Sequence, residues 1–391
     1  MQTASELEIY IHVPFCVQKC KYCDFLSFPK GKEIQYEYLC ALLKEIESFK
    51  QTEAAHELKE AHIVTSVFFG GGTPSLFESD WIDRILNTIR KNFDIDSDAE
   101  ITLECNPGTI SEGYLKSIRK AGVNRLSIGL QSALDKELKN IGRIHTYQDF
   151  LNTYDDAVKA GFTNINVDII SALPNQKKED IDKTLEKILS LNPTPKHISA
   201  YSLILEPGTE FMKLYEKGEL VLPDEDEERA FHWNIIDTLN NRGYELYELS
   251  NMAIPGYECR HNIGYWTGKE YIGFGLGAAS YVGDLRFSNT RSLDEYLKSF
   301  SGGNIGPIYS ESERLTGGDK MSEYMFLGLR LTRGISAVDF NIKFGQEIMD
   351  IFGPAIEKHL DEKLLERDGD MIRLTRKGQD VANYVFADFI I

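Results

Sequence analysis

Long hydrophobic runs are missing from this sequence of 391 residues. A bilayer-spanning helix needs roughly 20 consecutive apolar residues, and no stretch approaches that length. Residues 1–8 are polar and contain no apolar segment of the kind found in secretory signal peptides. We therefore expect no transmembrane segment and a cytoplasmic location.

Basic residues are fewer than acidic ones. The chain has 43 Lys and Arg and 61 Asp and Glu, which gives a formal net charge of −18. An acidic surface repels nucleic acids and anionic lipids unless a separate basic patch is present, and no basic run is long enough to form one. Internal repeats and low-complexity tracts are absent as well. We expect a globular protein whose charge keeps it in solution and which has no nucleic-acid partner.

Cysteine is scarce, with six residues, yet Cys16, Cys20 and Cys23 lie close together in the pattern C-x3-C-x2-C. They follow the short apolar run of residues 9–13. Cytosolic thiols stay reduced and free to bind metal, and thiolates crowded on one loop suit an iron–sulfur cluster. A cluster of four irons held by three cysteines leaves one iron open to an outside ligand.

Two other interpretations of this loop remain open. The thiols are either buried structural cysteines, two of them joined in a disulfide, or ligands of zinc. A structural zinc site normally has four ligands, so the fourth would come from His12 or from a distant residue such as Cys40.

Apolar strand-like segments alternate with helical segments over the first half of the chain. The expected strands are 8–13, 64–69, 100–105, 125–129, 165–170 and 197–203, and the expected helices include 33–50, 79–91, 111–121 and 178–191. This alternation is typical of parallel β/α units. It predicts an α/β protein whose first domain, residues 1–205, is a partial (β/α)6 TIM-type barrel.

Functional residues of such barrels lie at the carboxyl ends of the strands. The cysteine loop, the glycine-rich segment 70–74, Glu104, Gln131 and Asp168 all fall at or just after expected strand ends. We therefore expect them to meet at one mouth of the barrel.

The pattern changes after residue 205. We expect residues 206–305 to extend the barrel, with a helix opened by the acidic run 224–228, and residues 306–391 to form a smaller α+β domain. Helices near 319–329, 336–344 and 353–364, a hairpin over 366–374 and a final helix over 375–389 give that domain a winged-helix-like order. Such domains often bind DNA, but the acidic balance favours a packing or lid role.

The segment Gly70-Gly71-Gly72-Thr73-Pro74 allows a close backbone approach to a ligand and exposes N–H groups. It lacks the lysine of a phosphate-binding P-loop and the spacing of a dinucleotide fingerprint. A tight turn would explain the glycines equally well. Beside an open iron, however, a ligand with an amino and a carboxylate group fits this loop.

In its three cysteines, with Tyr22 before the third, the sequence resembles the radical S-adenosylmethionine (SAM) superfamily. Further segments resemble the oxygen-independent coproporphyrinogen III oxidase family over nearly the whole chain. They are Tyr10-Ile11-His12-Val13-Pro14-Phe15-Cys16, Phe69-Gly70-Gly71-Gly72-Thr73-Pro74, Leu130-Gln131-Ser132, Gly142-Arg143-Ile144-His145 and Asn166-Val167-Asp168-Ile169-Ile170.

The resemblance implies roles for matching positions. Cys16, Cys20 and Cys23 would hold a 4Fe–4S cluster, and Tyr10, Gly71, Glu104 and Arg143 would contact SAM. Positions that contact a second SAM in family oxidases correspond to Tyr22, Gly72, Thr73, Gln131 and Asp168. The implied chemistry is electron transfer from the reduced cluster to SAM, within a shielded cavity. Helix capping or ion pairing would explain several of these polar residues without a ligand.

Two departures separate the chain from the oxidases of this family. Phe25 stands where they have an additional cysteine, and the cluster motif begins as early as residue 16. Both features resemble the heme chaperone (HemW-like) branch, as does the H-N-x-x-Y-W core that starts at His261. The resemblance implies heme as a further cofactor. His261 is a reasonable axial ligand and Tyr265 and Trp266 could pack on the macrocycle, whereas a structural turn with a satisfied histidine is the alternative.

We therefore expect a heme chaperone on a radical SAM scaffold that delivers heme to recipient hemoproteins, with an electron donor for its cluster. The alternative is a coproporphyrinogen III oxidase, and a third is a cluster-bearing interaction protein without radical turnover. The sequence assigns no catalytic residue.

Overall fold

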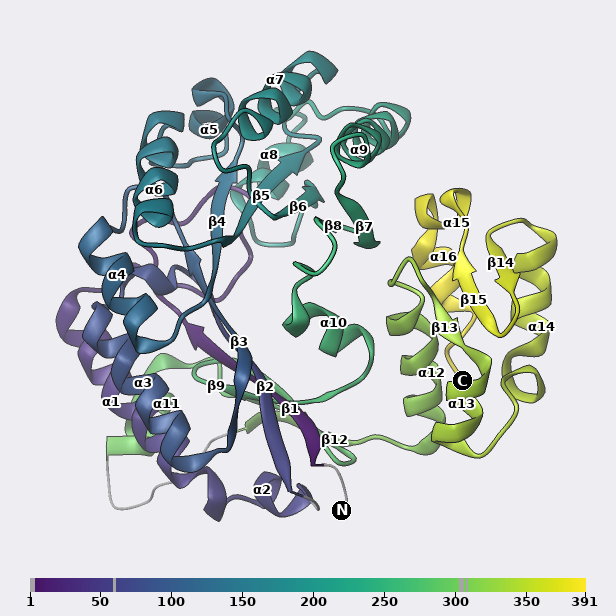
Figure 1. Cartoon of the computed structure of the whole chain (residues 1–391), viewed down its shortest axis with the longest axis horizontal. Helices are drawn as coiled ribbons and strands as arrows, with labels where there is room; N and C mark the ends of the chain where they lie inside the picture. Colours follow the sequence, from purple (N-terminus) through teal and green to yellow (C-terminus); the bar gives the residue numbers. More distant parts are fainter. Residues whose placement is uncertain (1–3, 59–60, 302–305, 307–308) are drawn as a thin grey trace.

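The computed structural model describes residues 4–58, 61–301, 306 and 309–391. Its centre is a twelve-stranded sheet in the order β12-β11-β10-β9-β1-β2-β3-β4-β5-β6-β8-β7 (Figure 1). Strands β1 to β6 are consecutive parallel neighbours. They are β1 Ser5–Val13, β2 His62–Gly71, β3 Ile95–Cys105, β4 Arg125–Gln131, β5 Asn164–Ser171 and β6 His197–Ser202. The predicted partial barrel is confirmed.

Helices connect these strands and cover the outer face of the sheet (Figure 1). They are α1 Lys32–Ser48, α2 Glu53–Glu57, α3 Ser79–Asn92, α4 Glu112–Ala121, α5 Asp135–Asn140, α6 Tyr147–Lys159 and α7 Lys178–Leu189. Helix α3 shows why they pack there, since Ile82, Ile85 and Ile89 recur at helical spacing and are fully buried. Helix α4 starts at a Ser111 side-chain cap and ends at Gly122, whose φ of 118° suits glycine.

Residues 245–314 extend the sheet at both edges. Strand β9 (Glu270–Phe274) pairs parallel with β1 and is followed by the antiparallel strands β10 (Ala279–Val282), β11 (Leu285–Asn289) and β12 (Tyr309–Arg314). At the other edge, β8 (Asn251–Ala253) pairs antiparallel with β6 and carries β7 (Glu245–Glu248). The glycine-rich segment 264–283 thus contributes strands to the main sheet, which its sequence pattern did not show.

Four further helices accompany this extension: α8 Glu210–Glu216, α9 Glu225–Asn240, α10 Arg260–Trp266 and α11 Leu293–Ser301. The predicted acidic helix start is confirmed in α9, where Asp224 and Glu227 form a capping box. Helix α10 packs against β2 and α12. No helix in the described ranges has the length and apolar character needed to cross a membrane.

The C-terminal part has its own sheet, β13-β15-β14, and its own hydrophobic core. Its elements are α12 Gly317–Gly328, β13 Ile335–Ser336, α13 Ala337–Phe344, α14 Ile348–Asp361, β14 Leu365–Asp368, β15 Met371–Leu374, α15 Arg376–Asp380 and α16 Ala382–Ala387. The predicted single helix over 375–389 is wrong, because the backbone leaves the helical region at Val381, with φ −127° and ψ 33°. Gly378 lies against the backbone of Leu364, which fixes the position of α15.

Contacts at α9 and β7 join the C-terminal part to the barrel. Thr332 donates its backbone N–H to the Tyr247 carbonyl at 3.0 Å. Arg376 donates to both carboxylate oxygens of Asp237 at 3.1 and 2.9 Å, and its guanidinium lies 3.9 Å from the ring centroid of Trp233. The polar character of these contacts is typical of an interface between domains of one chain.

Candidate metal and cofactor site

The cysteine loop follows β1 and is held at several points. The Cys16 N–H donates to the Phe28 carbonyl at 3.1 Å, and the Phe28 N–H donates to the Pro14 carbonyl at 2.9 Å. Further along, the Lys21 N–H donates to Ile141 O at 3.1 Å, and Phe211 N–H donates to Lys21 O at 3.0 Å. The loop is therefore fixed to β1 and, through Lys21, to the C-terminal end of α5 and the start of α8.

A cavity of about 370 Å3, here called the cysteine cavity, lies beside this loop at the strand ends. It is lined by ten of the residues predicted for the cluster and SAM: Cys16, Cys20, Tyr22, Cys23, Gly71, Gly72, Glu104, Gln131, Arg143 and Asp168. The expectation that strand-end residues meet at one mouth agrees with this placement. Their individual roles remain predictions.

A chain of polar contacts links two of the thiols. Thr73 Oγ1 lies 3.3 Å from Cys16 Sγ and accepts a hydrogen bond from Asn106 Nδ2 at 2.8 Å. Arg143 donates to Asn106 Oδ1 at 2.7 Å and to Cys20 Sγ at 3.7 Å. A third bond from Arg143, to the Gly129 carbonyl at 2.7 Å, fixes the guanidinium against β4. Donors that point at two sulfur atoms suit thiolates bound to a cluster.

The three thiols are half-buried and form no disulfide. In the described part of the chain, no group of three Cys, His, Asp or Glu residues is arranged around one metal ion. A cluster does not need that arrangement, because each cysteine binds a different iron corner. Burial raises the pKa of the Cys23 thiol to about 11, with Phe25 N–H partly opposing it, so a bound cation would be needed to keep that thiolate ionised at neutral pH.

Packing alone requires the glycines at the end of β2. A Cβ on Gly72 would lie 2.6 Å from the Phe15 carbonyl oxygen, and one on Gly71 would lie 2.6 Å from the His12 ring. Gly71 also has a φ of 112°, which favours glycine. The turn interpretation therefore accounts for the glycines, and their contact with a ligand stays a prediction.

Two carboxyl groups face the cysteine cavity from β3 and β5. Burial, followed by the nearby Asp168, raises the pKa of Glu104 to about 8. Burial also raises the pKa of Asp168, although hydrogen bonds from Asn166, Ser199 and Ser127 oppose it. Both groups accept hydrogen bonds readily, as sugar hydroxyls or an ammonium group would require.

Tyr10, Thr73 and His261 do not line the cysteine cavity. Thr73 is buried directly behind Cys16, as described above. Tyr10 stacks on His261 with ring centroids 6.4 Å apart, deeper in the barrel. His261 is 2 % exposed, and both of its ring nitrogens have partners, Ser66 Oγ at 2.8 Å and the Tyr265 hydroxyl at 2.9 Å.

A second cavity, of about 540 Å3, separates α10 and β9–β11 from α12 of the C-terminal part. We call it the aromatic cavity, since most of its wall is made of Tyr10, Tyr265, Trp266, Tyr271, Tyr281, Phe326 and Leu327. Lys269, Arg286 and Glu323 contribute the charged groups. Tyr10 lines this cavity. Burial, followed by the charge of Glu104 at the cysteine cavity, raises the pKa of Tyr10.

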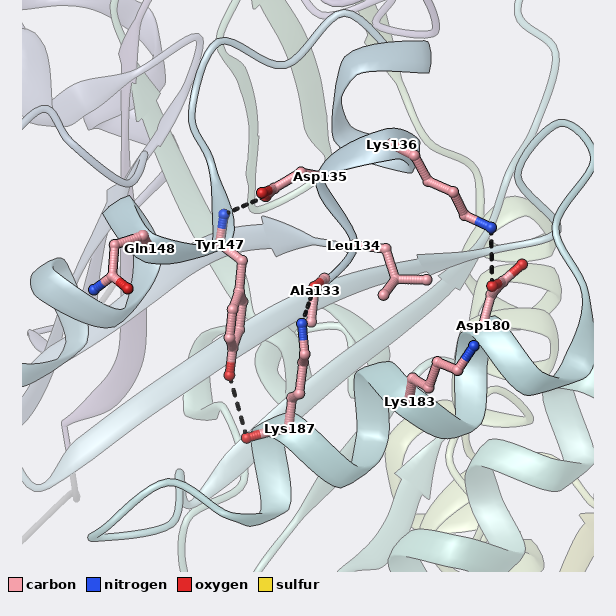
Figure 2. A pocket seen from close by; sticks show the side chains of 9 residues that line it. All are labelled: Ala133, Leu134, Asp135, Lys136, Tyr147, Gln148, Asp180, Lys183 and Lys187. Carbon is pink, nitrogen blue, oxygen red and sulfur yellow. Dashed lines mark hydrogen bonds and ion pairs between the residues drawn. The ribbon is translucent and has the colours of Figure 1, made fainter.

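A third cavity, of about 500 Å3, lies on the outer side between α5, α6 and α7 (Figure 2). Figure 2 shows that Lys187 Nζ donates to the Ala133 carbonyl and that Lys136 pairs with Asp180, at 2.8 and 3.0 Å. These lysines connect the helices to each other. We assign no ligand to this cavity.

Sequence reasoning missed several residues of the cysteine cavity. Asn106, Ser127 and Tyr201 line it, as do Ser202, Leu203, Ile204 and Glu206. Asn106 comes directly after β3, and Tyr201 and Ser202 end β6. The rule that functional residues follow strand ends would have found these three.

Comparison with known proteins gives a consistent relationship. The Radical SAM superfamily model matches residues 10–188, and the HemN C-terminal domain model matches residues 315–381. Heme chaperone HemW of Lactococcus lactis is 36% identical over 384 residues, which cover 98% of this chain and 97% of that protein. Heme chaperone HemW of Bacillus subtilis is 35% identical over 383 residues, covering 97% and 98%.

The solved structure of coproporphyrinogen III oxidase (HemN) from Escherichia coli, described as a radical SAM enzyme, matches with a TM-score of 0.83. The match covers 99% of this chain and 90% of that chain at 22% identity, so it shows the fold alone. The full-length relatives decide the branch: the chain belongs to the heme chaperone HemW family of the radical SAM superfamily.

Proposed function

We propose that this protein binds heme and delivers it to recipient hemoproteins, and that it holds a 4Fe–4S cluster and SAM in its cysteine cavity. The aromatic cavity carries the heme part of the proposal. Tyr265 and Trp266, from the H-N-x-x-Y-W segment, form part of its wall. Its volume of about 540 Å3 and its aromatic lining suit a flat, apolar macrocycle.

Membership of the radical SAM superfamily implies a 4Fe–4S cluster and SAM. We propose Cys16, Cys20 and Cys23 as the cluster ligands, with hydrogen bonds from Thr73 and Arg143 to two of the sulfur atoms. When reduced by an electron donor, such a cluster supplies an electron to the SAM sulfonium. The surrounding protein would limit the access of water and oxygen to this site.

For SAM, the cysteine cavity offers carboxyl groups at Glu104 and Asp168, the amide of Gln131 and the backbone of Gly71 and Gly72. Gln131 has a φ of 70°, uncommon for a residue other than glycine, at an irregularity of the β4–β5 pairing. This conformation ends strand β4 at Gln131, so the backbone turns at the cavity wall. These groups support SAM binding through its amino, carboxylate and hydroxyl groups.

Phe25 supports the chaperone over the oxidase. It lines the cysteine cavity, and it is 63% exposed at the position where oxidases of this family have an additional cysteine. The similarity to HemN supports the fold of both branches equally. A cytoplasmic location remains a prediction from the sequence.

The test uses anaerobically reconstituted protein with measured iron and sulfide contents. Added ferric heme should produce a saturable Soret band, and mixing with an apo-hemoprotein should transfer that band to the recipient. The same sample, with dithionite, SAM and coproporphyrinogen III, should form no protoporphyrinogen. Product formation would establish the oxidase instead. Absence of both heme binding and product would leave the third interpretation, a cluster-bearing interaction protein.

A further inference from the structure

The carboxyl group of Asp168 is held by buried partners. Asp168 lines the cysteine cavity and is only half-buried, although its strand neighbours Val167 and Ile169 are buried. Asn166 Nδ2 donates to Asp168 Oδ1 at 2.7 Å, and Ser127 Oγ donates to Oδ2 at 3.1 Å. Both donors are themselves buried. The carboxyl group is therefore fixed by the protein interior, while its exposed surface belongs to the cavity.

Asn166 is oriented in turn by His197, its partner across β5 and β6. His197 is fully buried, does not line the cysteine cavity, and has Nδ1 2.6 Å from Asn166 Oδ1. Asn166 Nδ2 also donates to Ser127 Oγ at 2.7 Å. With both amide hydrogens directed at Ser127 and Asp168, only the amide oxygen remains for His197. Ser199 Oγ is a second, longer donor to this oxygen at 3.2 Å, but it also serves Asp168.

One tautomer of His197 fits its surroundings. Because Asn166 Oδ1 only accepts, the ring proton lies on Nδ1, and Nε2 accepts from the Tyr247 hydroxyl at 2.9 Å. The Tyr247 oxygen accepts from the Cys259 backbone N–H at 3.3 Å, which leaves the phenol proton for His197. Burial and, after it, the charge of Arg125 lower the pKa of His197 well below its ordinary value. The ring is therefore neutral at neutral pH and carries a single proton.

We propose that His197 is a positioning residue for the Asp168 carboxyl group, acting through Asn166, in the binding of the ribose hydroxyls of SAM. This inference rests on the proposed binding of SAM in the cysteine cavity. The Nδ1 donor holds the Asn166 amide so that its N–H groups point at Asp168 and Ser127. In the opposite orientation the amide oxygen would face the carboxyl oxygen of Asp168. An acceptor fixed in advance loses less conformational entropy when a hydroxyl donor binds.

The test compares two substitutions of His197 that place an amide group at different positions. In His197→Asn the amide nitrogen is as many bonds from the backbone as Nδ1, so it can donate to Asn166. In His197→Gln the amide lies one bond further, at the position of Nε2, and Asn166 loses this donor. Both variants lack the imidazole ring, so they lose similar packing. Asp168→Asn removes the carboxylate itself and serves as the reference for complete loss.

Anaerobically reconstituted full-length proteins are titrated with SAM and with its 2′-deoxy and 3′-deoxy analogues. We expect the parent to bind at least one analogue roughly 10-fold more weakly than SAM, as the loss of a hydrogen bond to a charged group predicts. His197→Asn should keep this ratio to within about 3-fold, whereas His197→Gln and Asp168→Asn should bind SAM and the analogues within about 2-fold of each other. Circular dichroism verifies that each variant is folded.

Equal ratios in His197→Asn and His197→Gln would show that His197 acts through packing and would overturn the proposal. Equal affinities of the parent for SAM and both analogues would overturn it as well, while SAM binding itself stands. A parent that binds no SAM would overturn the proposed binding of SAM and this inference with it. Nitrogen-15 NMR of the histidine-labelled parent needs no variant to fold: it should show His197 protonated at Nδ1, and a proton on Nε2 would contradict the proposal.

Discussion

The hydroxyl of Thr73 lies 3.3 Å from the sulfur of Cys16, although the two residues are 57 positions apart in the sequence. The first follows β2 and the second follows β1, and the parallel pairing of these strands brings them together. Thr73 also accepts from Asn106, which in turn is bonded to Arg143. The surroundings of the cysteine sulfur atoms are thus formed by side chains that follow three different strands and by Arg143 from the loop after α5.

The variant Thr73→Val, which keeps the shape of the side chain, should weaken the cluster. Removal of the hydroxyl takes a donor from the Cys16 sulfur, and we expect roughly a 10-fold lower affinity for the cluster. The reduction potential should fall, since this hydrogen bond stabilises the more negative reduced state. Iron and sulfide contents and a redox titration measure both effects. Thr73→Ser, which retains the hydroxyl, is the control, and equal potentials for Val and Ser would contradict this role of Thr73.

Gly72→Ala should destabilise the fold even without cofactors. The new Cβ would lie 2.6 Å from the carbonyl oxygen of Phe15, so one of the two strand-end loops must move. We expect a loss of about 1–3 kcal/mol in the free energy of unfolding, measured by urea denaturation. Gly113→Ala is the matched control, because only Ser111 Oγ lies within 4 Å there, at 3.9 Å, and the residue is on the exposed side of α4. That variant should unfold at the parent's free energy or gain roughly a few tenths of a kcal/mol, because Gly113 lies in the first turn of α4.

Glu8→Gln should change how stability depends on pH. Glu8 is fully buried beside His261, Ser66 and Gly264. Burial raises its pKa from 4.5 to about 9, with Lys269 partly opposing. The folded state therefore holds this proton more tightly than the unfolded state, so the parent's free energy of unfolding falls as the pH rises from about 4.5 to about 9.

Glutamine mimics the protonated carboxyl and removes this dependence. At pH 5 the variant and the parent should have similar free energies of unfolding. At pH 9 the free energy of unfolding of the variant should be higher by roughly a few kcal/mol. Urea denaturation at pH 5, 7 and 9 measures the difference. A stability difference that stays constant across this range would show that Glu8 does not titrate in the folded protein.

Arg376→Ala should loosen the C-terminal part from the barrel. The variant loses the double hydrogen bond to Asp237 and the contact with the Trp233 ring, together roughly 1–2 kcal/mol. Hydrogen exchange should increase in α9 and α15. Arg373→Ala is the control, since the side chain of Arg373 donates within its own hairpin, to Glu366 at 2.7 Å. Equal exchange in the two variants would mean that Arg376 does not hold the interface.

Much of this architecture was predictable because its sequence signals are local. The six parallel strands and their helices follow from apolar periodicity, and the cysteine cavity follows from the rule for strand ends. The pairing of β9 with β1 was not visible, since Gly273 and Gly275 interrupt the apolar pattern and the partner strand lies more than 250 positions away. The direction of His261 was also hidden, because spacing alone does not show which side of the short helix α10 faces the barrel.

The edges of the six-stranded core have a consequence for the order of synthesis. Strand β1 is synthesised before the other strands, yet one of its two neighbours is residues 270–274. The outer edge of β6 pairs with residues 251–253, which are also synthesised later. Until about two thirds of the chain has been made, both edges expose unpaired backbone groups to other nascent chains. Both edges of the six-stranded core are therefore open to pairing with other chains during this interval, and premature termination near residue 205 would leave a product prone to aggregation.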